Sequence, residues 1–133
     1  MARYLLDTNI VSDLLRNPGG RAARRLAVVG EAAVCTSIVV ACELRYGAAK
    51  KGSAQLSERV EVLLGSLDVL ALDEDADRRY AEIRSQLERQ GTPIGPNDLL
   101  IAAHTLELDL ILVTADVDDF SRVPGLSMEN WLA

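Results

Sequence analysis

Acidic residues follow two of the apolar segments of this sequence, at positions where a carboxylate can take part in chemistry. Asp7 comes directly after the apolar stretch 3–6, and Asp116 comes two residues after the β-branched stretch 110–114. Both stretches are typical of short buried strands. In an open α/β sheet the functional crevice lies at the carboxyl ends of the strands, so we expect Asp7 and Asp116 to lie at one edge of a sheet.

Two further acids interrupt segments that are otherwise apolar. Glu43 lies within the apolar run 38–44, and glutamate is rarely buried unless it is paired or bound to a metal. Asp98 begins a predicted helix, and at about 100° per residue Ala102 and Thr105 lie within about 40° of it. Asp98 therefore starts a largely buried stripe, which is a face that a purely solvated acid does not normally occupy.

Together the four acids predict a metal site. Taken singly, Asp7 or Asp98 is better explained as a helix cap or a paired charge. Crowded carboxylates are costly unless a cation neutralises them, and hard divalent ions prefer oxygen ligands. We expect Mg²⁺ or Mn²⁺ to be held by Asp7, Asp98 and Asp116, with Glu43 completing the catalytic acids. The chemistry that such a site supports is hydrolysis of a phosphodiester.

Polar residues beside these acids are candidates for a supporting role. Thr8, Asn9 and Thr114 can orient metal-bound waters or the attacked phosphate by hydrogen bonding, although capping and turn formation explain them equally well.

The remaining candidate side chains receive structural interpretations. The single histidine, His104, lies about 120° around its helix from Asp98, so we expect it to be packed away from the acids. Cys35 and Cys42 have no zinc-site spacing and are expected to be small buried thiols. Four arginines are candidates for RNA contacts, although a solvated helix face is the favoured interpretation of each: Arg21, Arg24, Arg25 and Arg45.

Strand-like and helix-like segments alternate along the chain. Strands are predicted at 3–6, 33–35, 69–72 and 110–114, with a weak one at 126–128. Helices are predicted at 10–15, 21–29, 38–49, 53–67, 73–90 and 98–108, with Thr36-Ser37 as the N-cap of the third. This alternation predicts a single α/β domain, residues 1–133, folded as a three-layer α/β/α sandwich with a mainly parallel central sheet.

The charge distribution limits the classes of function. A net charge of −6 argues against a general nucleic-acid binder, because phosphate affinity comes from lysine and arginine. Residues 1–51 nevertheless carry eight basic against four acidic residues, so one half of the chain remains compatible with RNA. The N-terminal apolar run is too short for a signal peptide, and no stretch is long enough to span a membrane. We expect a cytoplasmic protein.

Several segments, in this order and spacing, resemble PIN-domain ribonucleases and, more narrowly, the VapC toxins of bacterial toxin–antitoxin pairs. The resemblance runs nearly end to end. It is carried by Leu5-Leu6-Asp7-Thr8-Asn9-Ile10-Val11-Ser12, by residues 38–47 around Glu43, by Ile94-Gly95-Pro96-Asn97-Asp98 through His104, by Leu112-Val113-Thr114-Ala115-Asp116, and by residues 120–131.

The resemblance implies a metal-dependent endoribonuclease that acts on RNA and is held inactive by a small VapB-like antitoxin, in a homodimer or a higher toxin–antitoxin assembly. The matching acids are Asp7, Glu43, Asp98 and Asp116. Many members of the family have asparagine at the position of Asp116 and an acid at that of Asp119, so the resemblance makes Asp119 a further candidate for the fourth acid. We rank Asp116 above it because Asp116 lies nearer the end of the strand.

Two other classes of function are compatible with parts of the pattern. A haloacid-dehalogenase-type phosphatase also has an aspartate after its first strand, but it expects a second aspartate two residues later, where this chain has Asn9. A non-enzymatic α/β interaction module would use the same acids structurally. Binding of a divalent metal distinguishes that module from a nuclease.

Overall fold

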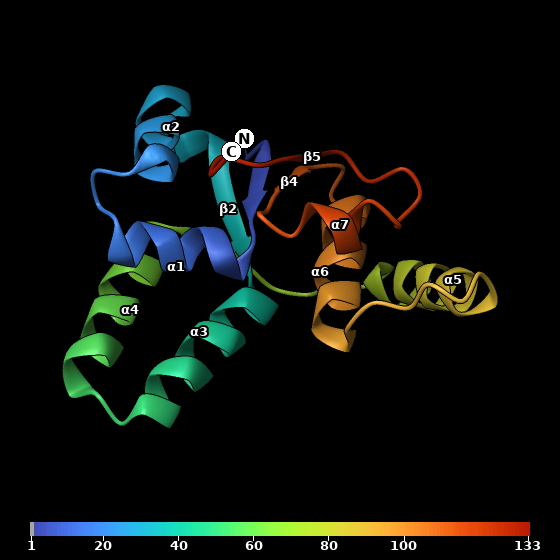
Figure 1. Ribbon diagram of the computed structural model, residues 1–133, viewed down its shortest axis with the longest axis horizontal. Coiled ribbons are helices and arrows are strands. Elements are labelled where there is room, and N and C mark those ends of the chain that lie inside the picture. Colours follow the sequence, from blue (N-terminus) through green and yellow to red (C-terminus); the bar gives the residue numbers. More distant parts are fainter. Residues whose placement is uncertain (1) are drawn as a thin grey trace.

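A parallel sheet forms the centre of the structure, a computed structural model that describes residues 2–133 (Figure 1). Within these residues the strand order is β3-β2-β1-β4-β5, and every neighbouring pair is parallel. The strands are β1 (Tyr4–Leu6), β2 (Val34–Ser37), β3 (Asp68–Leu70), β4 (Ile111–Val113) and β5 (Met128–Glu129). The first strand of the chain therefore lies in the middle of the sheet, where strands from both halves of the sequence pair with it.

Helices lie on both sides of the sheet. Figure 1 shows α1, α2 and α4 on one side of the strands and α5 and α6 on the other, with α3 packed against α1 and α4 and in contact with α6. The helices are α1 (Thr8–Arg16), α2 (Arg21–Val29), α3 (Ile38–Lys51), α4 (Ala54–Ser66), α5 (Ala76–Arg89), α6 (Pro96–Glu107) and α7 (Val117–Phe120), with a 3₁₀ turn at Glu31–Ala33. The predicted three-layer α/β/α sandwich is confirmed.

The central strand is buried on both faces. Leu5 and Leu6 have no exposed surface, and Tyr4 packs edge-to-face on Trp131 with ring centroids 5.4 Å apart. Parallel sheets covered by helices on both faces have such continuously apolar strands, and they leave polar side chains only at the strand ends. Among residues 2–133, no helix is both long and apolar enough to cross a bilayer.

Most predicted elements are present with shifted ends. The predicted N-cap is confirmed at Ser37, whose Oγ accepts a hydrogen bond from the backbone N–H of Val39 (3.1 Å). The helix predicted from residue 73 begins instead at Ala76, because Asp75 adopts a left-handed backbone conformation (φ 77°) that a helix cannot include. The weak last strand lies at 128–129 rather than 126–128.

Two features were not predicted correctly. Cys35 is buried as expected, but Cys42 is exposed. The reason is that one residue in each turn of the apolar run of α3 faces solvent. The four-residue helix α7 is absent from the prediction, since one turn is too short to show a periodic pattern.

We expect Phe120→Ala to lower the free energy of unfolding by about 3–5 kcal/mol, because Phe120 is fully buried at the end of α7 and its removal leaves a cavity. Urea unfolding of the two proteins measures this loss. Phe120→Leu, which keeps most of the volume, should cost less. A loss below about 1 kcal/mol for the alanine variant would show that α7 does not rest on this side chain.

Candidate metal centre and active site

The carboxyl ends of β1 and β4 bring the first and last parts of the site together. These two strands are neighbours in register, with Leu6 opposite Val113, and the backbone N–H of Asp7 donates to the carbonyl of Val113 at 2.9 Å. Asp7 thus leaves the sheet beside the segment that leads to Asp116. The prediction that these two acids lie at one edge of the sheet is confirmed.

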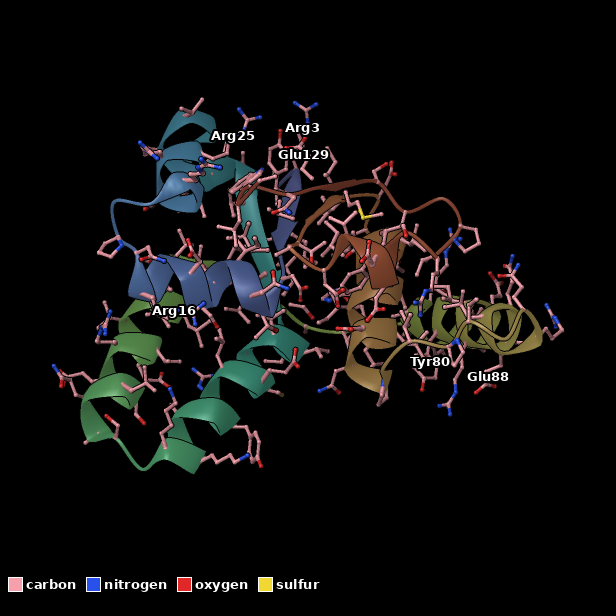
Figure 2. The ribbon with its side chains drawn as sticks, in the orientation of Figure 1. Arg3, Arg16, Arg25, Tyr80, Glu88 and Glu129 are labelled. Carbon is pink, nitrogen blue, oxygen red and sulfur yellow. The ribbon has the colours of Figure 1, made fainter. Side chains whose placement is uncertain are left out.

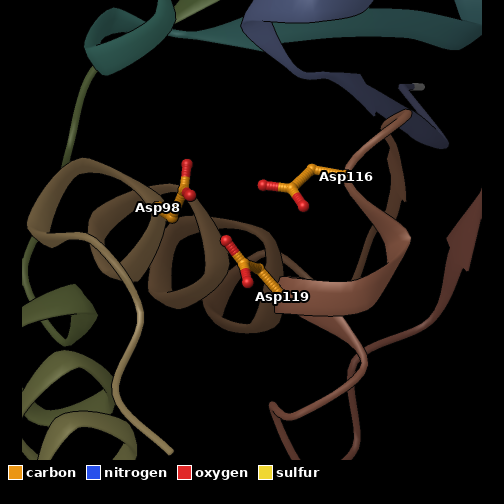
Figure 3. A group of neighbouring side chains, drawn as sticks. All are labelled: Asp98, Asp116 and Asp119. Carbon is orange, nitrogen blue, oxygen red and sulfur yellow. The ribbon is translucent and has the colours of Figure 1, made fainter.

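Three aspartates form the tightest acidic group in the described part of the chain. One carboxylate oxygen from each of Asp98, Asp116 and Asp119 lies within 4.8 Å of the others. Figure 3 shows the three side chains pointing toward one another, Asp98 from the start of α6 and the other two from the start and the turn of α7. All three are half-buried.

Asp119, which the sequence interpretation ranked below Asp116, belongs to this cluster. The structure places it in the same cluster as Asp116, since the single turn of α7 brings residues three apart onto one side. The i, i+3 spacing of the two aspartates was the signal that could have found it. Asp119 also lies 3.5 Å from Arg122 Nη1, which offsets part of its charge.

Asp7 is fixed in place by hydrogen bonds. It is 3% exposed and caps α1, with Oδ1 accepting the backbone N–H of Thr8 at 2.7 Å. Its Oδ2 accepts the hydroxyl of Thr114 at 2.7 Å and the amide of Asn9 at 3.3 Å. The interpretation of Asp7 as a helix cap is therefore confirmed, and the cap also fixes the carboxylate beside the acidic cluster.

The neighbouring polar residues connect the acids to one another. Thr8 Oγ1 donates to Glu43 Oε1 at 2.6 Å, although 35 positions separate the two residues in the sequence. Thr114 Oγ1 accepts the backbone N–H of Asp116 at 3.0 Å, and Asn9 Oδ1 accepts that of Ala115 at 3.0 Å. The side chains of Thr8, Asn9 and Thr114 thus position the acids and the loop after β4.

The burial and crowding of these carboxylates raise their pKa values. Burial raises the pKa of Asp98 from 3.8 to about 6, and the negative charges of Asp7, Asp116, Glu43 and Asp119 add to the increase. Burial also raises the pKa of Asp7, against the hydrogen bonds from Thr114 and Thr8. The pKa of Asp116 is raised by burial and by the charge of Asp119. The site therefore favours a positive charge at its centre.

The donor set fits a hard divalent cation. Around an octahedral Mg²⁺ with bonds near 2.1 Å, adjacent and opposite ligand oxygens lie roughly 3–4 Å apart. The three aspartate oxygens, all within 4.8 Å of one another, need only a small contraction to reach this spacing. The nearby Asp7 and Glu43 contribute charge, as their effects on the pKa of Asp98 show.

The other candidate residues lie away from this cluster. Arg45 makes two hydrogen bonds to Glu61 on α4 (2.8 and 3.0 Å) rather than approaching Glu43. Arg25 lies 3.8 Å from Glu129, and Figure 2 shows this pair at the far end of the strands from α3. As predicted, His104 is packed in the interior, where it contacts Ser37.

Comparison with known proteins decides the family. The PIN domain family matches residues 4–126. The chain is 37% identical to the tRNA(fMet)-specific endonuclease VapC of Shigella flexneri, covering 98% of this chain and 99% of the relative, and 34% identical to ribonuclease VapC2 of Rickettsia felis, covering 96% and 97%. It belongs to the VapC ribonucleases of the PIN-domain family. This assignment replaces the haloacid-dehalogenase interpretation.

The fold comparison agrees with the family. The crystal structure of VapBC2 from Rickettsia felis bound to a DNA fragment from their promoter superposes with a TM-score of 0.89 at 32% identity, covering 96% of this chain and 98% of that chain. The acids that we identified at the sheet edge therefore lie in a VapC fold that is matched along nearly its whole length.

We expect Asp98→Asn to stabilise the metal-free protein by roughly 1 kcal/mol near pH 7, a value reduced for solvent screening because Asp98 is only half-buried. Because folding raises the pKa of this carboxyl, the wild type is most stable relative to the variant below about pH 4 and loses that advantage as the pH rises through about 6.

Urea unfolding in EDTA at about pH 4 and about pH 7 measures this effect. The matched control is Asp118→Asn, since Asp118 is an exposed acid beside the cluster. If Asp98→Asn destabilises the protein at neutral pH, Asp98 holds the fold by pairing rather than a metal.

Proposed function

We propose that this chain is a Mg²⁺- or Mn²⁺-dependent endoribonuclease and the toxin of a toxin–antitoxin pair, neutralised by a small VapB-like antitoxin. The observation that carries the proposal is the cluster of Asp98, Asp116 and Asp119, with Asp7 and Glu43 close by, at the sheet edge of a VapC fold. The function rests on these five acids.

In this proposal the acids bind the metal and accept a proton from water. When bound, a divalent ion supplies positive charge for the phosphodiester and makes water a better nucleophile. Asp98, Asp116 and Asp119 are our candidates for holding it, and Asp7 completes the set at an orientation fixed by its hydrogen bonds. Thr8 holds Glu43 at Oε1, so Glu43 Oε2 is our candidate acceptor for a proton from water.

The bond changes then follow from the use of water as the nucleophile. The water oxygen joins phosphorus, the bond from phosphorus to the ribose 3′-oxygen breaks, and that oxygen takes up a proton. The RNA 2′-hydroxyl has no role in this reaction. The products carry 5′-phosphate and 3′-hydroxyl ends.

We expect RNA cleavage with Mg²⁺ or Mn²⁺ and none in EDTA. Total RNA is the first substrate, and tRNA(fMet), the substrate in the name of the Shigella relative, is the first defined one. Asp119→Asn should lower the rate more than ~100-fold, since even partners of metal ligands are worth about 10–100-fold. Its neighbour Asp118→Asn should cleave like the wild type. Cyclic 2′,3′-phosphate ends would contradict the mechanism.

A groove beside the acids supports the antitoxin part of the proposal. It has a volume of about 210 Å³ between α1, α3 and α4, and it reaches Thr8 and Glu43 at one end. Its walls are mainly apolar, with basic residues among them: Leu15, Leu44, Ala48, Leu56, Val60, Arg16, Lys51 and Arg59. An amphipathic helix of a partner fits such a groove, and a basic side chain on the same segment can reach the acids and compete with the metal.

The solved relatives support the same arrangement. The Rickettsia felis structure is a VapBC complex on promoter DNA. We propose that this chain likewise assembles with its antitoxin, as a homodimer or a higher assembly. Expression of the chain alone should slow growth, because a metal-dependent RNA-cutting site has no internal means of inhibition, and Asp7→Asn should relieve the effect.

We expect Gly47→Trp to weaken antitoxin binding at least about 10-fold by filling the groove. Gly47 lines the groove on α3, and a Cβ at this position meets no atom within 4 Å, so the helix tolerates the change. Gly65→Trp is the control, since Gly65 on α4 is equally open but does not line this groove.

Calorimetric titration with the small protein that co-purifies with this chain measures both variants. Equal affinity of the two tryptophan variants would place the antitoxin elsewhere on the surface, without affecting the proposal of a nuclease.

A further inference from the structure

His104 joins two helices that carry acids of the site. It is the single histidine of the chain and is 1% exposed, on the same helix as Asp98. Its Nδ1 lies 2.8 Å from Ser37 Oγ. Ser37 ends β2 and caps α3, the helix of Glu43, so this hydrogen bond connects the start of α3 to α6.

The Ser37 hydroxyl serves both partners at once. A hydroxyl has one hydrogen and two lone pairs. One lone pair accepts the backbone N–H of Val39 at 3.1 Å, which leaves the hydrogen or the second lone pair for His104 Nδ1. The first turn of α3 is thereby fixed to α6, and α3 and α6 are in contact along their packed faces.

Stability alone explains a histidine at this position poorly. The imidazole reaches the backbone of Ala71, but within residues 2–133 His104 Nε2 makes no hydrogen bond of good geometry. A buried polar atom without a partner is unfavourable, and an apolar side chain of similar size would fill the space without it. Burial lowers the pKa of His104, against the opposing effects of Glu107 and Asp73, so the ring acts as a neutral hydrogen-bonding group.

We propose that His104 is a positioning residue for the nuclease site, which acts through Ser37 to set the placement of α3, and thereby of Glu43, relative to Asp98 on α6. The inference rests on the proposed function. Thr8 already fixes Glu43 to the start of α1. The hydrogen bond between His104 and Ser37 supplies the connection that Thr8 cannot, namely the one between the helix of Glu43 and the helix of Asp98.

The test uses two substitutions of His104 in the full-length chain. Asparagine keeps a polar group near the position of Nδ1 and removes Nε2, whereas leucine fills the space and loses the hydrogen bond to Ser37. The control is Thr105→Val, since Thr105 is the next buried residue and its hydroxyl bonds only within α6, to the carbonyl of Ile101. Thermal melts in EDTA confirm that each variant is folded.

We expect His104→Leu to melt no lower than the wild type, yet to lower kcat for RNA cleavage by about 10–100-fold and to weaken Mn²⁺ binding about 10-fold by calorimetry. KM for RNA should stay within about threefold of the wild type, because the RNA contacts are unchanged. His104→Asn should recover most of the kcat and the Mn²⁺ affinity, and Thr105→Val should match the wild type.

Unchanged kcat and Mn²⁺ affinity in His104→Leu would overturn the proposal, as would equal losses in the asparagine, leucine and Thr105→Val variants. The measurements of RNA cleavage and of Mn²⁺ binding separate this inference from the proposed function. A wild type that binds Mn²⁺ but cuts no RNA contradicts the nuclease, and the Mn²⁺ affinities of the variants then still decide the role of His104. A wild type that binds no Mn²⁺ overturns both.

Discussion

The burial and crowding of carboxylates is the constraint around which this structure is organised. Burial raises the pKa of Asp98 to about 6, with the charges of neighbouring acids adding to the increase, and burial and nearby acids also raise the pKa of Asp7 and Asp116. Such a group cannot hold itself together, so neutral donors have to fix it in place. Thr8, Thr114 and backbone N–H groups do this. The fold gives up stability at this edge in exchange for a site that attracts a cation.

The order of the strands determines which acids meet. Because β1 lies in the middle of the sheet, its end is adjacent to the ends of both β2 and β4. Asp7 is consequently hydrogen-bonded to Thr114, which is 107 residues away in the sequence. The helix after β2 then brings Glu43 to Thr8. A parallel sheet collects its carboxyl ends at one edge, so residues from all four connections between the strands form one site.

The basic residues divide into some that are paired with acids away from the site and others that line the groove. Arg45 and Arg25 are engaged with Glu61 and Glu129, away from the acids. Arg16 (labelled in Figure 2), Lys51 and Arg59 instead line the groove between α1, α3 and α4. In a chain with a net charge of −6, the proposed mechanism needs a cation at the acids to offset the charge of a phosphodiester.

The sequence by itself determined the elements and four of the acids. Asp7 and Asp116 follow apolar strands, and Glu43 and Asp98 lie on apolar faces, and these are local patterns. Only the tertiary structure decided that Asp119 joins Asp116, because α7 has a single turn and shows no periodicity. The same holds for the hydrogen bonds of Thr8, Thr114 and His104. Their partners lie on other elements, and sequence spacing carries no information about which elements pack side by side.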